Sequence, residues 1–372
     1  MHRPHRRRAA QARALFRVGG RRSVTISPSR LAPVFVPRIW GSRSLAPLFD
    51  SGPAATEPIG EVWLTGDRCT FASGPLTGRS LGESWTGLSA EWKGRRLQAT
   101  SRIPLLLKFI FPEEKLSVQV HPDDEYARRH EAAAGGTGKT EMWYAVAARP
   151  GAELRLGLEP GIVPEIFRQA LKDSDIERCL SPLSVQTGDA FFVPAGSAHT
   201  IGPGVLLCEV QEHSDITYRI FDYNRRQADG SSRPLHVRQA LDVLQFGTQR
   251  CGRVHGVQVQ QGSAKKTYLV ACPYFATEIW EFDGAIPATT CPDRFELLVP
   301  IEGHGRIHWR SESMPYLPGE AWVLPAALGE FQLAAQSATK LLRTYVPDLE
   351  QLSRELAENR LNESQRSAIL RQ

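Results

Sequence analysis

Many short runs rich in β-branched and aromatic residues, separated by Gly and Pro, follow one another along this 372-residue chain. Runs of this kind are typical of β-strands, and their close spacing favours barrels or sandwiches. We therefore expect a mostly β fold, with helical patterns only at 123–134, 163–171, 235–246 and 348–371. The predicted strands are 105–111, 117–121, 141–147, 190–193, 205–211, 268–272, 295–301 and 321–324.

The segment 115–121 alternates in the manner of a half-buried strand. Side chains two residues apart on a strand point to the same side, so Ser117, Gln119 and His121 share one face. We expect this face to line the inside of a barrel.

Two further segments carry candidate metal ligands next to turn residues. Glu141 follows a Gly-Lys-Thr sequence, and His199 ends a Pro-Ala-Gly-Ser-Ala-His sequence. With Gln119 and His121 they supply two imidazoles, one carboxylate and one amide oxygen, a set that suits zinc or another divalent ion and leaves room for water or substrate. A structural zinc site would more often use thiolates, yet the six cysteines form no C-x-x-C pair. The sequence therefore predicts one metal site.

Positive charge is concentrated at the start of the chain. The first 49 residues contain eleven Arg and no Lys, Asp or Glu, whereas the rest holds 34 basic and 40 acidic residues, a net charge of −6. The folded body is therefore mildly acidic, which does not indicate nucleic-acid binding. The Arg-rich start has the composition of an organelle transit peptide. We instead interpret residues 1–30 as a disordered basic tail or an over-extended start.

Other sequence features concern compartment and cofactors. No apolar run approaches the roughly eighteen residues that a membrane span requires, so we expect no membrane association. Six scattered cysteines in a chain of this length fit a reducing environment, and we predict a cytoplasmic protein. The chain has no P-loop and no dinucleotide-binding fingerprint, so no nucleotide cofactor is implied.

Several stretches of the chain resemble the type I mannose-6-phosphate isomerase family, a metal-dependent group of the cupin superfamily, and particularly its shorter bacterial members. The resemblance runs from about residue 31 to about residue 347, and its most specific motifs lie between 105 and 225. The matching stretches are 38–42, 105–110, 117–124, 138–144, 188–202 and 209–222.

This resemblance implies two cupin domains, each a jelly-roll β-barrel. An internal repeat agrees with it, because a Gly-acid pair precedes Pro194 and Pro325 at the same spacing. Five residues after the proline stands His199 in the first copy and Glu330 in the second, so we expect the second copy to have lost its metal. We predict a catalytic metal-binding cupin domain over 31–248 with a small helical insertion at about 160–182, a degenerate second cupin domain over 249–347, and a C-terminal helical tail over 348–372.

The family's reaction interconverts mannose 6-phosphate and fructose 6-phosphate through an enediol. It needs an acid/base, a cation near the enediolate and an anchor for the phosphate. Arg219 matches the family's active-site arginine and can stabilise the enediolate, although pairing with Asp215 or Asp222 would give it a structural role. Ser117 and Lys139 match substrate-contacting positions, with phosphate as the expected target; Lys139 could also exchange protons if its pKa is depressed.

Other interpretations stay open at this point. The chain could be a cupin isomerase or epimerase for another phosphosugar, or a non-catalytic sugar-binding cupin. Glu209, Glu212 and His213 could supply a second acid/base or be structural. The expected partner is a small phosphosugar, and the sequence predicts no oligomeric state.

Overall fold

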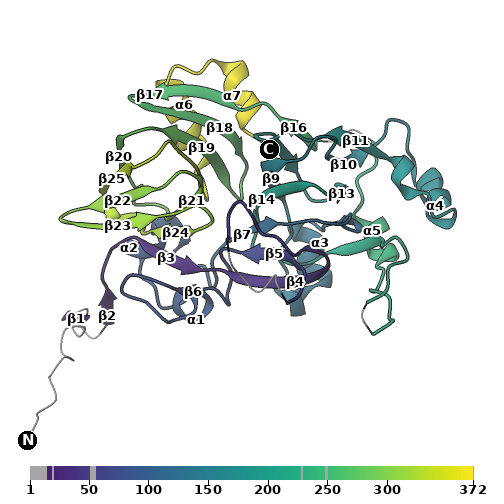
Figure 1. Cartoon of the computed structure of the whole chain (residues 1–372), viewed down its shortest axis with the longest axis horizontal. Coiled ribbons are helices and arrows are strands. Elements are labelled where there is room, and N and C mark those ends of the chain that lie inside the picture. The colour runs from purple at the N-terminus through teal and green to yellow at the C-terminus, as the bar shows by residue number, and fades with distance from the viewer. Residues whose placement is uncertain (1–14, 19–20, 51–55, 228, 248–249, 372) are drawn as a thin grey trace, which may run out of the picture.

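The structure is a computed structural model that describes residues 15–18, 21–50, 56–227, 229–247 and 250–371. Within these residues the chain forms four β-sheets of four or more strands, one two-stranded pair and seven α-helices. Figure 1 shows two β-rich halves, with the first strands along the lower edge of the view and the C-terminal helices at the top. The mostly β fold is confirmed.

The first half consists of a seven-stranded and a five-stranded sheet that face each other. Trp143 and Phe191 of the larger sheet pack with Leu154 and Ile201 of the smaller one in a buried cluster. In ladder order the larger sheet is β16 (Gly252–Val254), β12 (Ala190–Val193), β9 (Glu141–Ala148), β14 (Val205–Glu212), β7 (Leu105–Ile110), β5 (Ile59–Trp63) and β4 (Val34–Ser42), and the smaller is β11 (Leu180–Ser184), β10 (Glu153–Leu158), β13 (His199–Ile201), β8 (Val118–Val120) and β15 (Tyr218–Phe221).

The second half repeats this plan with an eight-stranded and a four-stranded sheet. Trp280 and Trp322 of the larger sheet pack with Trp309 and Phe331 of the smaller one. The larger sheet is β17 (Val257–Gln261), β18 (Ala264–Ala271), β19 (Ala276–Phe282), β26 (Thr339–Tyr345), β21 (Glu296–Glu302), β24 (Ala321–Leu324), β3 (Ser29–Ala32) and β6 (Thr70–Phe71), and the smaller is β20 (Ala285–Thr289), β25 (Glu330–Ala335), β22 (Gly305–Trp309) and β23 (Glu312–Tyr316).

The two large sheets pack against each other through their outer faces. Leu107 and Phe109 of β7 share one buried cluster with Leu297 and Val299 of β21. Because side chains alternate along a strand, Lys108 between the first two residues points to the opposite face, toward the five-stranded sheet. This packing gives a strand such as β7 two buried faces and fixes which residues reach the interior of the first half.

The helices are short and lie outside the sheets. α3 (Asp124–His130) begins at Asp123, whose carboxylate accepts the backbone N–H of Tyr126 at 2.8 Å. The predicted helical insertion contains α4 (Pro164–Lys172), and the predicted C-terminal helix is divided into two by the cap residue Asn362. The other helices are α1 (Leu81–Trp85), α2 (Ala90–Lys93), α5 (Val237–Val243), α6 (Leu349–Glu358) and α7 (Glu363–Ile369).

The strand orders of the two large sheets correspond. The series β16-β12-β9-β14-β7-β5-β4 matches the series β3-β24-β21-β26-β19-β18-β17. Val193, just before Pro194, pairs with Glu141, and Leu324, just before Pro325, pairs with Glu296. Glu296 therefore takes the place of Glu141 in the second ladder, where the guanidinium Nε of Arg343 donates to its carboxylate at 2.8 Å.

The predicted domain boundaries remain a proposal. β3 and β6 come from the predicted catalytic domain but pair within the eight-stranded sheet, and β16 comes from beyond residue 248 but pairs with β12. In the predicted N-terminal tail, β1 (Leu15–Val18) pairs with β2 (Arg21–Val24), and residues 1–14, 19 and 20 lie outside the described residues.

The contact between the two halves predicts a large effect of Phe295 on stability. Phe295 is fully buried, and its ring meets Trp85 edge-on with a centroid distance of 5.2 Å. We expect Phe295→Ala to lower the free energy of unfolding by about 3–5 kcal/mol, measured by chemical denaturation. Leu317→Ala is the control, because Leu317 is 52% exposed, and equal losses in the two variants would contradict the prediction.

Candidate metal centre

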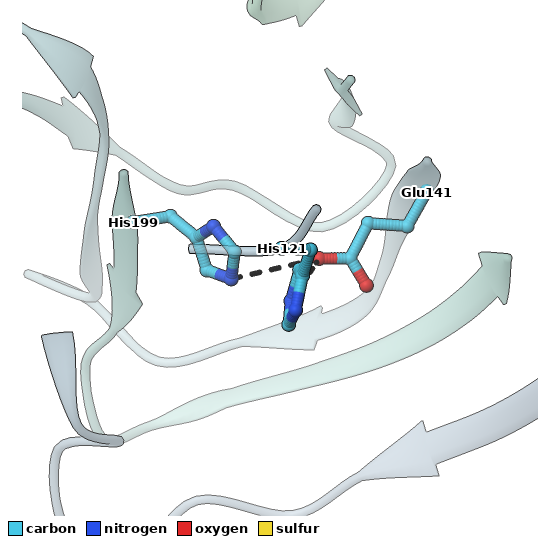
Figure 2. Close-up of side chains that lie close together, drawn as sticks. All are labelled: His121, Glu141 and His199. Atoms are coloured by element: carbon cyan, nitrogen blue, oxygen red, sulfur yellow. Dashed lines mark ion pairs between the residues drawn. The ribbon is translucent and has the colours of Figure 1, made fainter. Parts of the chain in front are cut away.

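Three potential metal ligands converge inside the first half. Glu141 begins β9, His199 begins β13, and His121 directly follows β8. Glu141 Oε1 lies 3.3 Å from His121 Nε2 and 3.5 Å from His199 Nε2. Figure 2 shows both imidazole rings and the carboxylate turned toward one another. The three side chains are no more than 2% exposed, so the group is shielded from solvent.

Backbone carbonyls set the tautomer of both histidines. His121 Nδ1 lies 2.8 Å from the carbonyl oxygen of Ile216, and His199 Nδ1 lies 3.0 Å from that of Ser197. A carbonyl can only accept, so each Nδ1 must carry the proton. Each Nε2 therefore presents a lone pair toward the shared point, as a metal-binding histidine requires.

The site contains an oxygen that lacks a hydrogen-bond donor. Glu141 Oε1 is buried without a hydrogen-bond partner among the described residues. The other oxygen, Oε2, accepts from Lys139 Nζ at 3.0 Å, and Lys139 Nζ also lies 3.2 Å from His121 Nε2. A divalent ion bound to Oε1 and both Nε2 atoms would satisfy the unpaired oxygen, so the residues present fit such an ion.

Electrostatics keep these groups in the forms that bind a metal. Burial and the charge of Lys139 hold the pKa of His121 well below its usual value, and burial and His121 lower the pKa of His199 to about 4. Burial opposes ionisation of Glu141, but Lys139 and His199 lower its pKa overall. At neutral pH the site thus offers neutral imidazoles and an ionised carboxylate.

Gln119, the fourth predicted ligand, lies beside the three. It pairs in register with His199, and its Nε2 lies 3.1 Å from His199 Nε2. Its Oε1 lies 3.3 Å from the hydroxyl of Ser117, which donates to it. The amide nitrogen therefore faces the site, and a half-turn of the amide is needed before its oxygen can bind a metal. The ligand role of Gln119 stays a prediction.

A cavity of about 420 Å³ is lined by every other predicted site residue, and it reaches the three ligand candidates through Lys139 and Gln119, which contact them. Ser117, Lys139 and Arg219 all line it, together with Gln119. Cationic side chains dominate the wall, which suits an anionic ligand. The charged and imidazole groups on the wall are Arg38, Glu61, Lys108, Lys139, Glu209, Asp215, Arg219, Arg233 and His236.

Lys108 holds three carboxylates of this wall together. Its Nζ lies 3.0 Å from Asp215, 3.7 Å from Glu61 and 3.8 Å from Glu209. Burial opposes its charge, but the three carboxylates hold the pKa of Lys108 above its usual value. Burial and the nearby charge of Glu141 raise the pKa of Glu209 above its usual value.

Arg219 lines the cavity and also has a buried donor that lacks a partner in the described part of the chain. Its Nη1 donates to the carbonyl of Pro234 at 3.0 Å, whereas its buried Nε has no partner among the described residues. The two aspartates considered as its structural partners bind other cations. Asp215 pairs with Lys108, and Asp222 pairs with Arg225 and Arg233.

Several wall residues were not assigned a role from the sequence. Lys108 lies in a matching stretch, and a lysine inside the otherwise apolar run of β7 was a usable signal because lysine is rarely buried without a partner. Glu209 was left open between two roles. No sequence pattern indicated that Arg38, Arg233 and His236 line one cavity, because only the fold brings them to it.

Comparison with known proteins identifies the family. Residues 29–148 match the model of the phosphomannose isomerase type I catalytic domain, and residues 264–346 match that of the mannose-6-phosphate isomerase cupin domain. A mannose-6-phosphate isomerase of Bacillus subtilis is 33% identical over 318 residues, covering 83% of this chain and 96% of the relative. The chain belongs to the type I mannose-6-phosphate isomerase family.

Other members of the isomerase family agree with this assignment. The Streptococcus mutans mannose-6-phosphate isomerase is 33% identical over 79% of this chain and 91% of its own length. The crystal structure of the Bacillus subtilis enzyme superposes with a TM-score of 0.77 at 29% identity, covering 86% of this chain and 99% of that one. A zinc-bound mannose 6-phosphate isomerase shares the fold, with a TM-score of 0.68, 15% identity and coverage of 86% and 99%.

The geometry predicts that His199 is required for metal binding. We expect His199→Ala to weaken zinc binding by more than the roughly 10- to 100-fold that loss of an outer partner costs, because it removes a direct donor. Isothermal titration of the metal-free protein with zinc measures the effect. His255→Ala, which changes an exposed loop histidine, is the matched control, and unaltered zinc affinity in His199→Ala would refute the assignment.

Proposed function

We propose that this protein is a zinc-dependent isomerase that interconverts mannose 6-phosphate and fructose 6-phosphate. The observation that carries the proposal is the unpaired carboxylate oxygen of Glu141 between two imidazole nitrogens, next to Lys139, which lines a cationic cavity. Zinc is the proposed ion because the donor set suits it and because a structural neighbour with the same fold binds zinc. When bound, the ion would supply Lewis acidity toward the sugar oxygens.

The chain's own residues would position the substrate and move the proton. Arg219 stays protonated and lines the cavity, so it can stabilise negative charge on an enediolate oxygen. Lys139 lies beside the metal ligands and can bind the substrate or exchange a proton there. Ser117 lines the same cavity and can donate to a sugar oxygen. An enediol route needs these three functions within one cavity.

We further propose a cytoplasmic location, with a small phosphosugar as the partner. Cys69, Cys179, Cys208, Cys272 and Cys291 are free thiols, as expected in a reducing compartment. Among the helices of the described residues, none has the length and apolar character needed to cross a bilayer.

Removal of the metal tests the proposal. We expect chelation to abolish conversion of mannose 6-phosphate to fructose 6-phosphate, and added zinc to restore it, in a coupled assay of one protein preparation. Activity that persists in protein shown by metal analysis to be metal-free would contradict the proposal. Turnover of other phosphosugars but not of mannose 6-phosphate would shift it to another substrate.

Arg219 provides a second test. We expect Arg219→Lys to lower kcat on the order of a hundredfold, because an ammonium cannot replace the planar donor fork. Arg79→Lys, at an exposed position outside the cavity, is the control and should match the parent protein. An unchanged kcat in Arg219→Lys would remove this residue from the proposed mechanism.

A further inference from the structure

Charged side chains cross the seven-stranded sheet in a row that starts at the metal centre. The neighbouring strands β9, β14, β7, β5 and β4 carry Glu141, Glu209, Lys108, Glu61 and Arg38. Lys108 bridges Glu209 and Glu61, and Glu61 accepts from Arg38 Nε at 2.8 Å. Neighbouring strand backbones are about 4.8 Å apart. The backbones of Arg38 and Glu141 are therefore separated by four strand spacings, roughly 19 Å along the sheet.

The facing five-stranded sheet has a corresponding row. His199, Gln119 and Arg219 lie opposite one another on β13, β8 and β15, and β15 is the edge strand. Beyond this edge, the segment 233–236 is attached to Arg219, whose backbone N–H donates to His236 Nδ1 at 3.2 Å. Arg233 of this segment lines the cavity. Both rows therefore begin with metal-ligand candidates and end with arginines.

The two ends of these rows differ in how their cationic side chains are paired with carboxylates. At the metal end, Lys139 is paired with Glu141 at 3.0 Å. At the other end, Arg38 shares Glu61 with Lys108, and Asp222 is shared by Arg225 and Arg233. Asp215 also pairs with Lys108 and Glu114 with Arg225, whereas Arg219 forms no ion pair among the described residues, so this end keeps a net positive charge that suits a dianion.

Electrostatic coupling links the arginines. After burial, the charges of Arg233 and Arg38 both contribute to lowering the pKa of Arg219. The three guanidinium groups therefore act on one another across the same cavity, and a bound anion would relieve their repulsion.

We propose that Arg38 and Arg233, which lie beyond Arg219 in the same cavity, form the subsite for the substrate's phosphate group. The inference rests on the proposed function, because a hexose 6-phosphate carries its phosphate at the end of the chain opposite the reacting C1 and C2. With phosphate on the guanidinium N–H groups that Glu61 and Asp222 leave free, these carbons extend toward the metal centre and Lys139. Lys139 then acts near the reacting carbons instead of anchoring the phosphate.

Binding of inorganic phosphate to the full chain tests the subsite without requiring turnover. By isothermal titration, we expect Arg38→Gln and Arg233→Gln to weaken phosphate binding on the order of tenfold or more, because each removes a charge-assisted contact. The control is Arg226→Gln, which changes an exposed arginine seven residues before Arg233 that does not line the cavity. Chelation should stop turnover and leave phosphate binding in place.

Steady-state kinetics provide a second test of the subsite. We expect both Gln variants to raise KM for mannose 6-phosphate with little change in kcat. If a Gln variant fails to fold in a thermal melt, Arg38→Lys and Arg233→Lys keep the charge and should weaken phosphate binding less, through loss of the fork. Phosphate binding that is lost in Lys139→Gln but unchanged in the Arg38 and Arg233 variants would overturn the proposal. If no isomerase activity is found, the titration with inorganic phosphate still tests the subsite.

Discussion

The packing of the two halves and the position of the candidate site both depend on the burial of the seven-stranded sheet on both of its faces. One face packs against the eight-stranded sheet through Leu107, Phe109 and their neighbours. The other face looks into the first half, where Lys108 and Glu209 meet. Because the side-chain period of a strand is two, a slip of one residue would put these charges into the apolar contact between the sheets. The register of the sheet is therefore fixed by the same residues that form the site.

Burying so many charges is costly unless each has a counter-charge. The wall of the cavity meets this requirement with a connected network, since Lys108 alone contacts three carboxylates. Burial would raise the pKa of Glu61, yet Lys108 and Arg38 lower it to about 2. Two of the buried side-chain atoms that lack a partner within the described residues, Glu141 Oε1 and Arg219 Nε, belong to residues for which a functional role is proposed.

The second half shows how the same ladder position can be stabilised without a histidine pair. Glu296 stands where Glu141 stands in the first half, and Arg343 stands where Glu209 stands. Arg343 donates to Glu296 and lies within 3.3 Å of Glu278, so its fixed guanidinium charge neutralises the buried carboxylates. In the first half the corresponding carboxylate keeps one oxygen free for a ligand.

The sequence by itself determined eight of the 26 strands of the described residues and the three residues that could hold a metal ion. The strand pattern is local, and all eight predicted strands are present with ends that differ by a few residues. His121, Glu141 and His199 each lie in a short motif, so the sequence alone indicated that they could bind a metal, and the structure shows that they converge. Only the tertiary structure decided how the cavity wall is completed, because Arg38, Lys108 and Arg233 become neighbours through strand order and register. It also decided that β3 joins the second half, since pairing between distant strands depends on which edges are left open once both large sheets have packed together.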